Sequence, residues 1–416
     1  MSRLLLSVLA LLAVVWPSPD RPQIGLGAAP ARVEVTATPG GRGSQQIVVS
    51  NSGQNDLEIA VTVEPYRGAG AGNRSAVGWL TVEPAHFTLR AGQQQAVTVR
   101  IALPRDGSLP SGGRYAQVVF QTAPLRGPQG AGLSGRLGVP FLFTVQGQGP
   151  LVERAELADL RPVLAGPGLV SLVALFVNQG NVHLFPHGHA ELWPEAGEMS
   201  SRDLRETTAV LPEEEKELVT TSPLPVTPGG AYRARAVVEY GRDGRAGREV
   251  AFIASARPEI VALTALEEER LTLQVKLRST GGLWLQPRAC FAVQDAEGVV
   301  TYGVACSSRG WLQPQGETTL ATPYDGNLEA GVYTLAVQVE YGDGEPLRGS
   351  ARFEKRTGRQ ATAPGWEVNA GRPQEEEKRE ERSRWLLVGM AGALLLLLLI
   401  VLILLLILWK RRPARS

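Results

Sequence analysis

The residues Val238-Glu239-Tyr240-Gly241 recur 101 positions later as Val339-Glu340-Tyr341-Gly342, and this recurrence decides the fold. The match extends without a gap over residues 170–241. Apolar residues at every second position coincide, as do glycines, prolines and a tyrosine. The coinciding pairs are Val170 and Leu271, Leu172 and Leu273, Ala174 and Val275, Phe176 and Leu277, Gly180 and Gly281, Pro186 and Pro287, Gly197 and Gly298, Gly230 and Gly331, and Tyr232 and Tyr333. Because such positions determine backbone geometry and the buried face, the repeat predicts two copies of one β-sandwich.

A further sandwich is predicted upstream, between Arg32 and Val145. Apolar residues alternate with others along residues 57–63, which is typical of a strand with one buried face. Roughly seven short strands in about 115 residues fit a sandwich. The turn Asn51-Ser52-Gly53 resembles Asn178-Gln179-Gly180, and Gly113-Arg114-Tyr115 resembles the Gly-x-Tyr of the repeat. These tyrosines occupy the place of a corner tyrosine, whose hydroxyl bonds to nearby backbone.

The composition agrees with an all-β chain and excludes few classes of function. The 416 residues include 47 Gly and 29 Pro, while aromatic residues make up 6%. The formal net charge of +1 gives no electrostatic preference for nucleic acid. We therefore expect no nucleic-acid partner.

The two ends of the chain predict export and anchoring. Arg3 and the short apolar segment Leu4–Val15 indicate a signal peptide that ends near Ala29, with an uncleaved anchor as the alternative. Trp385–Trp409 is 25 residues without a charge, about 37 Å as a helix, which spans a bilayer. The tail Lys410–Ser416 is basic, so the large N-terminal part is expected outside the cytoplasm.

These observations predict an all-β protein of three tandem immunoglobulin-like β-sandwich domains with one C-terminal transmembrane α-helix, single-pass in the cell membrane. The expected segments are a signal peptide at 1–29, sandwiches at 30–148, 149–256 and 257–354, a juxtamembrane stalk at 355–384, the transmembrane helix at 385–409 and a cytoplasmic basic tail at 410–416.

Three of the four histidines, His183, His187 and His189, lie close together in the sequence. If a strand begins after Pro186, His187 and His189 point to one face, an arrangement that suits a metal ion. The alternative is an exposed polar strand. The second copy of the repeat has Trp284, Arg288 and Cys290 at the equivalent positions, so the fold does not require histidine there.

Cys290 and Cys306 are the two cysteines of the chain, and they flank the turn Asp295-Ala296-Glu297-Gly298 almost symmetrically. They are expected to face each other across a hairpin, where a disulfide can form outside the cytoplasm. In the chain-entropy model, a disulfide that closes a loop of this length adds about 3 kcal/mol to the free energy of unfolding. The alternative is a pair of free thiols.

The sequence contains no nucleophile elbow, phosphate-binding loop or paired-carboxylate motif. We therefore expect no enzyme activity, no catalytic residues and no cofactor.

Residues 32–122 contain Trp79-Leu80-Thr81-Val82-Glu83-Pro84 and Ser111-Gly112-Gly113-Arg114-Tyr115. These motifs resemble the first immunoglobulin-like domain of bacterial WxL-interacting cell-surface proteins, and more widely the pilus-chaperone-like sandwiches. Asn178-Gln179-Gly180-Asn181-Val182-His183 resembles the second domain of that family. The resemblance implies a surface protein whose first domain contacts peptidoglycan and whose second domain binds a protein. The third sandwich departs from the family layout.

The expected function is that of a membrane-anchored extracytoplasmic binding or scaffold protein that contacts the cell wall or another exported protein. One alternative is a metal-binding ectodomain, an enzyme or sensor, that uses His183, His187 and His189. Another is a subunit that assembles a membrane complex through its helix. The sequence leaves the oligomeric state open.

Overall fold

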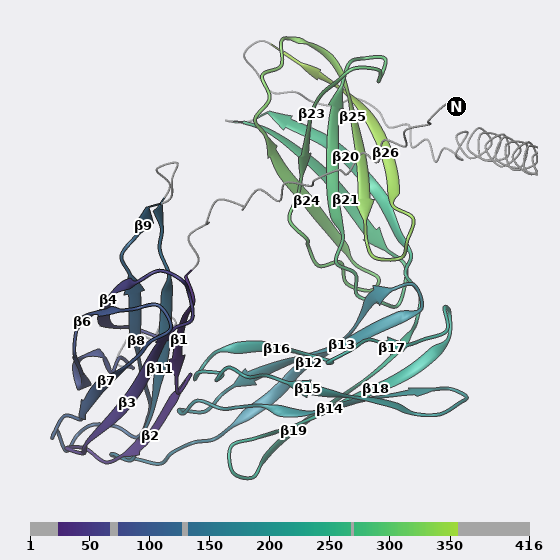
Figure 1. Ribbon diagram of the computed structural model, residues 1–416. Helices are drawn as coiled ribbons and strands as arrows, with labels where there is room; N and C mark the ends of the chain where they lie inside the picture. Colours follow the sequence, from purple (N-terminus) through teal and green to yellow (C-terminus); the bar gives the residue numbers. More distant parts are fainter. Residues whose placement is uncertain (1–23, 67–73, 127–131, 268–269, 357–416) are drawn as a thin grey trace, which may run out of the picture. The chain divides into compact units, whose positions relative to one another are not determined.

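The computed structural model describes residues 24–66, 74–126, 132–267 and 270–356 (Figure 1). This part of the chain is all-β, as predicted, with strands β1 to β26 and one short 3-10 turn, Val77–Trp79. No helix in it is long and apolar enough to cross a membrane. The predicted transmembrane helix, 385–409, the basic tail and most of the stalk and signal peptide lie outside the described residues.

The first sandwich packs two sheets against each other, with strand orders β1-β3-β7-β5 and β2-β11-β8-β4-β6. All pairs are antiparallel except β2 with β11. The alternation predicted in β4 is present, since Leu57, Ile59 and Val61 are buried in the core between the sheets. The strands are β1 Leu26–Ala29, β2 Val33–Ala37, β3 Arg42–Asn51, β4 Leu57–Glu64, β5 Leu80–Glu83, β6 His86–Leu89, β7 Gln94–Ala102, β8 Gly112–Thr122, β9 Leu125–Arg126, β10 Gly132–Leu133 and β11 Arg136–Val145.

Strand β1 lies in a segment that the sequence analysis assigned to the signal peptide. Leu26–Ala29 pair with Val48–Asn51 of β3, and Leu26 and Ala28 pack against the first core. Small residues are compatible with both a cleavage site and an edge strand, which is why the sequence pattern did not separate them. In the structure this segment belongs to the first sandwich.

The second sandwich has sheets ordered β12-β13-β16 and β15-β14-β18-β19, with β17 pairing to β13. Its strands are β12 Ala155–Gly166, β13 Leu169–Asn178, β14 His187–Pro194, β15 Ser200–Arg205, β16 Glu215–Val219, β17 Leu224–Pro225, β18 Ala231–Tyr240 and β19 Gly244–Ile253.

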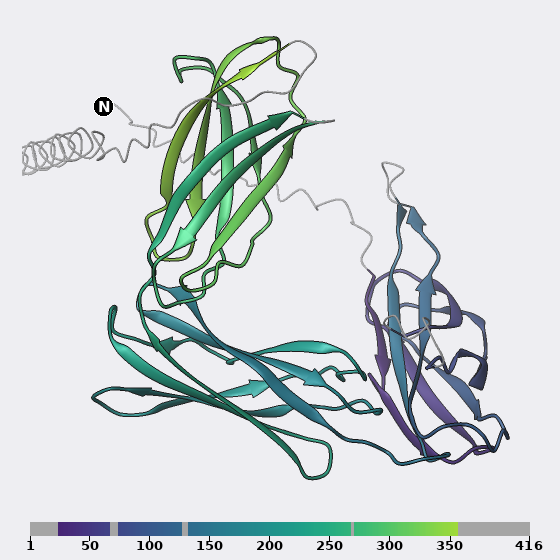
Figure 2. The same ribbon diagram turned by 180° about the vertical axis from the view of Figure 1, so that it is seen from behind.

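The third sandwich has the same topology, with sheets ordered β20-β21-β24 and β23-β22-β25-β26. Figure 2 shows these two layers from behind. The shift of 101 positions places Ser200–Arg205 of β15 on Thr301–Cys306 of β23. The strands are β20 Pro258–Glu267, β21 Leu271–Ser279, β22 Arg288–Gln294, β23 Thr301–Cys306, β24 Glu317–Tyr324, β25 Gly331–Glu340 and β26 Leu347–Lys355.

The chain divides into two compact units between Ser255 and Ala256. The first unit contains the first and second sandwiches, and the second unit contains the third.

Candidate functional site

Two of the three clustered histidines lie on the outer face of β14. His187 and His189 alternate with the buried Ala190 and Leu192, as the sequence predicts for a strand that begins after Pro186. Nε2 of His187 is 3.8 Å from a Glu239 carboxylate oxygen. The histidines line a shallow surface hollow together with Asp203 and Arg205.

His183 lies elsewhere, in the loop before β14, and packs against the first sandwich. Its ring meets the rings of Tyr115 and Phe185 edge to face, with centroids 5.7 Å apart in each case. Burial lowers the pKa of His183 to about 4. The three histidines are therefore not brought together, and no group of three or more His, Cys, Asp or Glu in the described ranges could hold a metal ion.

The loop that carries His183 forms a joint between the first and second sandwiches. The Gly113 backbone N–H donates to the Asn181 carbonyl at 2.7 Å. The Asn181 side chain accepts from the Val152 N–H at 2.8 Å and donates to the Pro150 carbonyl at 3.0 Å. Asn181 thus ties the end of the first sandwich, the connecting segment and the second sandwich together.

Charged and apolar contacts extend this joint. The Arg32 guanidinium lies 4.2 Å from the centroid of the Phe185 ring and donates to the Thr207 carbonyl at 3.1 Å. Arg74 pairs with Glu213 at 2.9 Å. A small buried cluster lies beneath, made of Tyr115, Leu142, Ala209 and Leu211. No sequence pattern predicts the joint, because its contacts link residues far apart in the chain that share no repeat, such as Gly113 with Asn181 and Arg74 with Glu213.

Tyr115 differs from the other predicted corner tyrosines. The Tyr232 hydroxyl accepts from the Thr227 N–H at 2.7 Å, and the Tyr333 hydroxyl donates to the Glu329 carbonyl at 2.9 Å. Tyr115 Oη is buried and has no hydrogen-bond partner among the described residues, and burial raises its pKa. Gly113 is required beside it, since a Cβ there would overlap the Tyr115 hydroxyl.

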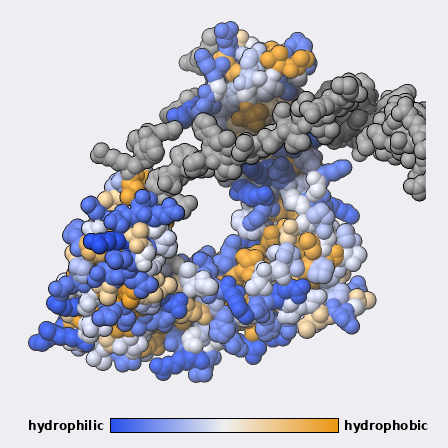
Figure 3. Space-filling model, viewed as in Figure 1, coloured by the Kyte–Doolittle hydropathy of each residue, from blue (hydrophilic) through white to orange (hydrophobic). Residues whose placement is uncertain are grey.

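The outer face of β13 in the second sandwich is apolar. Val170, Leu172, Ala174 and Phe176 point into the core and are fully buried. The residues between them point outward: Leu169 is exposed, Ser171, Leu175 and Val177 are partly exposed, and Val173 is buried. Leu169 is 38% exposed, and Val219 on β16, which lies opposite Val173, is 45% exposed. Figure 3 shows apolar side chains gathered on the second sandwich over this sheet.

The third sandwich carries polar residues at the same places. On β21 the outward residues at the positions of Ser171, Val173, Leu175 and Val177 are Thr272, Gln274, Lys276 and Arg278. Lys276 and Arg278 both pair with Glu317 of β24 at 2.6 Å. The second and third sandwiches share one topology, although the outward residues are mainly apolar on β13 and polar on β21. Folding therefore does not require the apolar outer face of β13.

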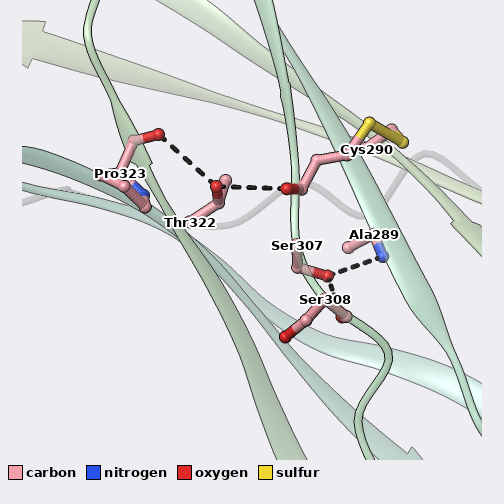
Figure 4. Close-up of a disulfide and its surroundings, with 7 residues drawn as sticks. Ala289, Cys290, Ser307, Ser308, Thr322 and Pro323 are labelled. Atoms are coloured by element: carbon pink, nitrogen blue, oxygen red, sulfur yellow. Dashed lines mark hydrogen bonds between the residues drawn. A yellow bond between two sulfur atoms is a disulfide. The ribbon is translucent and has the colours of Figure 1, made fainter. Parts of the chain in front are cut away.

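Cys290 and Cys306 lie directly opposite each other on β22 and β23 and are joined by a disulfide (Figure 4). Both side chains lie on the outer side of the sheet, because their neighbours Ala289 and Ser307 are buried. The Ser307 hydroxyl accepts from the Ala289 N–H at 3.1 Å, and Thr322 of β24 donates to the Cys306 carbonyl at 3.3 Å.

No protein-family model matches the chain, and no curated protein matches it. Solved structures that are similar include the Salmonella enterica SafA pilin in complex with the SafB chaperone, at 16% identity and a TM-score of 0.30, covering 56% of this chain and 99% of that chain. Another is the Escherichia coli chaperone DraB, at 12% identity and a TM-score of 0.29, covering 55% of this chain and 98% of that one. The immunoglobulin-like fold follows from the strand order and register of the three sandwiches.

Proposed function

We propose that this chain is a non-enzymatic, membrane-anchored extracytoplasmic scaffold that binds another exported protein through its second sandwich. The observation that supports the proposal best is the apolar outer face of β13. A sheet face that folding does not require to be apolar, but which is apolar, is typical of a protein contact surface. The resemblance to WxL-interacting proteins points the same way, since it implies a protein partner for the second domain and peptidoglycan for the first.

The outward residues are suited to a contact of moderate strength. Full burial of a Leu or Val side chain contributes about 1.5–3 kcal/mol. Arg161 of β12 reaches toward Glu217 of β16 at 3.1 Å and also pairs with Asp159 at 2.7 Å. Since β13 lies between β12 and β16, this bridge crosses the outer face of β13 beside Val173 and Leu175, so the face combines apolar contact area with polar groups that lie within it.

The proposal is tested with the tagged full chain in intact cells, by cross-linking followed by recovery of bound exported proteins and wall fragments. The variant Leu175→Lys with Val177→Arg carries the residues that the third sandwich has at these positions, Lys276 and Arg278. A matched control, Met199→Lys with Ile253→Arg, adds the same charge at exposed positions elsewhere on the second sandwich. We expect the control to retain the partner and the face variant to lose it.

Recovery of the same proteins by both variants would contradict binding through this face. Recovery of neither protein nor wall by the unchanged chain would contradict a scaffold role altogether.

Anchoring and orientation are tested separately. Protease added to intact cells should degrade residues 32–354, because the basic tail after the apolar segment 385–409 favours retention of the C-terminal end inside. Protection of that large segment in intact cells, with loss only after access from the inner side, would overturn the predicted localisation.

A further inference from the structure

Strand β23 forms one edge of its sheet and is strongly apolar on the outside. It pairs with β22 alone, and the order of the sheet places it at the end. Val304 is 65% exposed and Tyr302 is 54% exposed, while the preceding turn residues Val299 and Val300 are 79% and 53% exposed. These four lie within six consecutive residues, 299–304, and no other six consecutive residues in the described ranges hold as many exposed large apolar side chains.

The backbone of this edge is available for pairing. The Cα atoms of Cys290 and Cys306 are 4.0 Å apart, the close spacing of a non-hydrogen-bonded antiparallel pair. The N–H and C=O groups of Cys306 and of Val304 therefore point away from β22. The Cys306 carbonyl accepts from Thr322, whereas no backbone partner of Val304 lies on that side in the part of the chain that is described.

Other long edges carry charges that oppose pairing, and β23 does not. Within the described ranges, the edge strands of six or more residues besides β23 are β12, β15, β19, β20, β24 and β26, and each contains at least one charged residue. Charges on an edge strand hinder its pairing with another chain. The equivalent of Val304 in the second sandwich is Asp203, which forms an ion pair with Arg205 at 2.8 Å. The absence of charge on β23 is thus not a property of the fold.

We propose that β23 pairs antiparallel with β23 of a second copy of this chain, about a two-fold axis at Val304. A two-fold contact requires one surface to complement itself. Val304 then faces Val304 of the other copy as a hydrogen-bonded pair, and Gly303 faces Ala305, while Tyr302 lies in the β-bulge between Gly303 and Thr301. No like charges are opposed. An uncharged, apolar edge strand favours edge-to-edge pairing of identical copies, because neither copy carries a charge that opposes it.

The disulfide contributes to this inference. It joins the edge strand covalently to β22, so β23 keeps its place in the sheet while the outward backbone groups of Val304 lack a backbone partner among the described residues. An edge held in its paired conformation loses less entropy on association than a free one. This self-pairing does not depend on the scaffold function proposed above.

The experiment uses two differently tagged copies of the full chain, produced together, and measures how much of one precipitates with the other. Val304→Lys places two like charges face to face across the axis, as does Val304→Asp. We expect each variant to precipitate with itself at least fivefold less than the unchanged chain. The Lys variant combined with the Asp variant should recover most of the signal, because opposite charges then meet. Val304→Thr keeps the N–H and the β-branched shape and should remain within twofold of the unchanged chain.

Folding is checked by the Cys290–Cys306 disulfide, which each variant should retain. The second sandwich has Asp at the equivalent position, so the Asp variant provides an acceptable strand. Three results would overturn the proposal: no co-precipitation of unchanged copies, like-charged pairs that precipitate as well as unchanged copies, or no recovery when Lys and Asp variants are combined.

Discussion

The rings of Tyr115 and His183 meet edge to face between the first and second sandwiches, and neither Tyr115 Oη nor His183 Nδ1 has a hydrogen-bond partner among the described residues. A buried polar atom without a partner costs about 1–3 kcal/mol. The two residues therefore belong to a joint that is held by ring packing and by the surrounding backbone bonds.

The stability of the first unit should fall as the pH decreases from about 6.5 to about 4. Burial lowers the folded-state pKa of His183 to about 4, so the unfolded chain takes up the proton first. The neutral His183 contributes fully to the free energy of unfolding above its ordinary pKa of about 6.5. This contribution falls as the pH decreases toward the folded-state pKa, by at most about 3 kcal/mol in total. His183→Phe keeps the ring contacts and should remove this part of the pH dependence. Denaturant unfolding of both proteins at several pH values measures the difference, and parallel curves would contradict it.

Tyr115→Phe should stabilise the first unit by about 1 kcal/mol, because it removes a buried hydroxyl that has no partner. Tyr240→Phe is the matched control in the same unit. The Tyr240 hydroxyl lies 3.0 Å from the Ala155 carbonyl and 3.1 Å from the Ala155 N–H, so its loss should cost about 1 kcal/mol. Opposite signs of the two changes are the expected result in denaturant unfolding. A loss of stability on Tyr115→Phe would show that its hydroxyl is bonded.

Asn178→Ala should destabilise the second sandwich by about 2–3 kcal/mol. Its fully buried amide donates to the carbonyls of Val182 and Val210 at 2.8 and 2.9 Å and accepts from the Gly180 N–H. The Val182 carbonyl would lose its donor and the Gly180 N–H its acceptor, while the Val210 carbonyl would keep its bond from the Leu184 N–H. The repeat supplies the comparison: Ser279→Ala should cost less, since Ser279 accepts a single bond, from the Gly281 N–H at 3.3 Å. Equal losses of stability for Asn178→Ala and Ser279→Ala in thermal unfolding would contradict this role of the Asn178 side chain.

Reduction of the Cys290–Cys306 disulfide should destabilise the third sandwich by up to about 3 kcal/mol, given a sequence separation of 16 residues. The first unit holds no cysteine in its described part, so its transition should not move. Unfolding with and without reductant tests both statements, and the Cys290→Ala, Cys306→Ala double variant should match the reduced protein. A shift of the first transition would contradict the division into separate units.

Strand positions in the sandwiches could be predicted because burial imposes a period of two and the repeat fixes its register. Leu273 and Val275 were assigned to the core on that basis, and both are fully buried. Cys290 and Cys306 face each other because a hairpin turn determines which residues lie opposite. His183 shows where this reasoning ends. It lies before β14, where the backbone does not alternate, so its distance from His187 along the chain says little about its place in space.

The joint itself could not be predicted for a related reason. Its contacts, such as Gly113 with Asn181, depend on how the first and second sandwiches meet, and no local pattern encodes that pairing. The apolar character of an outer face also could not be predicted from periodicity alone. Alternation identifies the inward residues and places no constraint on the outward ones. The repeat pairs Leu175 and Val177 with Lys276 and Arg278, and the structure shows that all four side chains lie on the outer face.

The cross-strand disulfide has a consequence for a chain under tension. Pulling on the two ends of the third sandwich loads β20 and β26, which contain its first and last strand residues. Even after complete mechanical unravelling, the residues between Cys290 and Cys306 would not extend, because the covalent bridge bypasses them. At ~3.4 Å per residue this withholds about 50 Å of contour length. In force spectroscopy, reductant should lengthen the final extension of this sandwich by that amount.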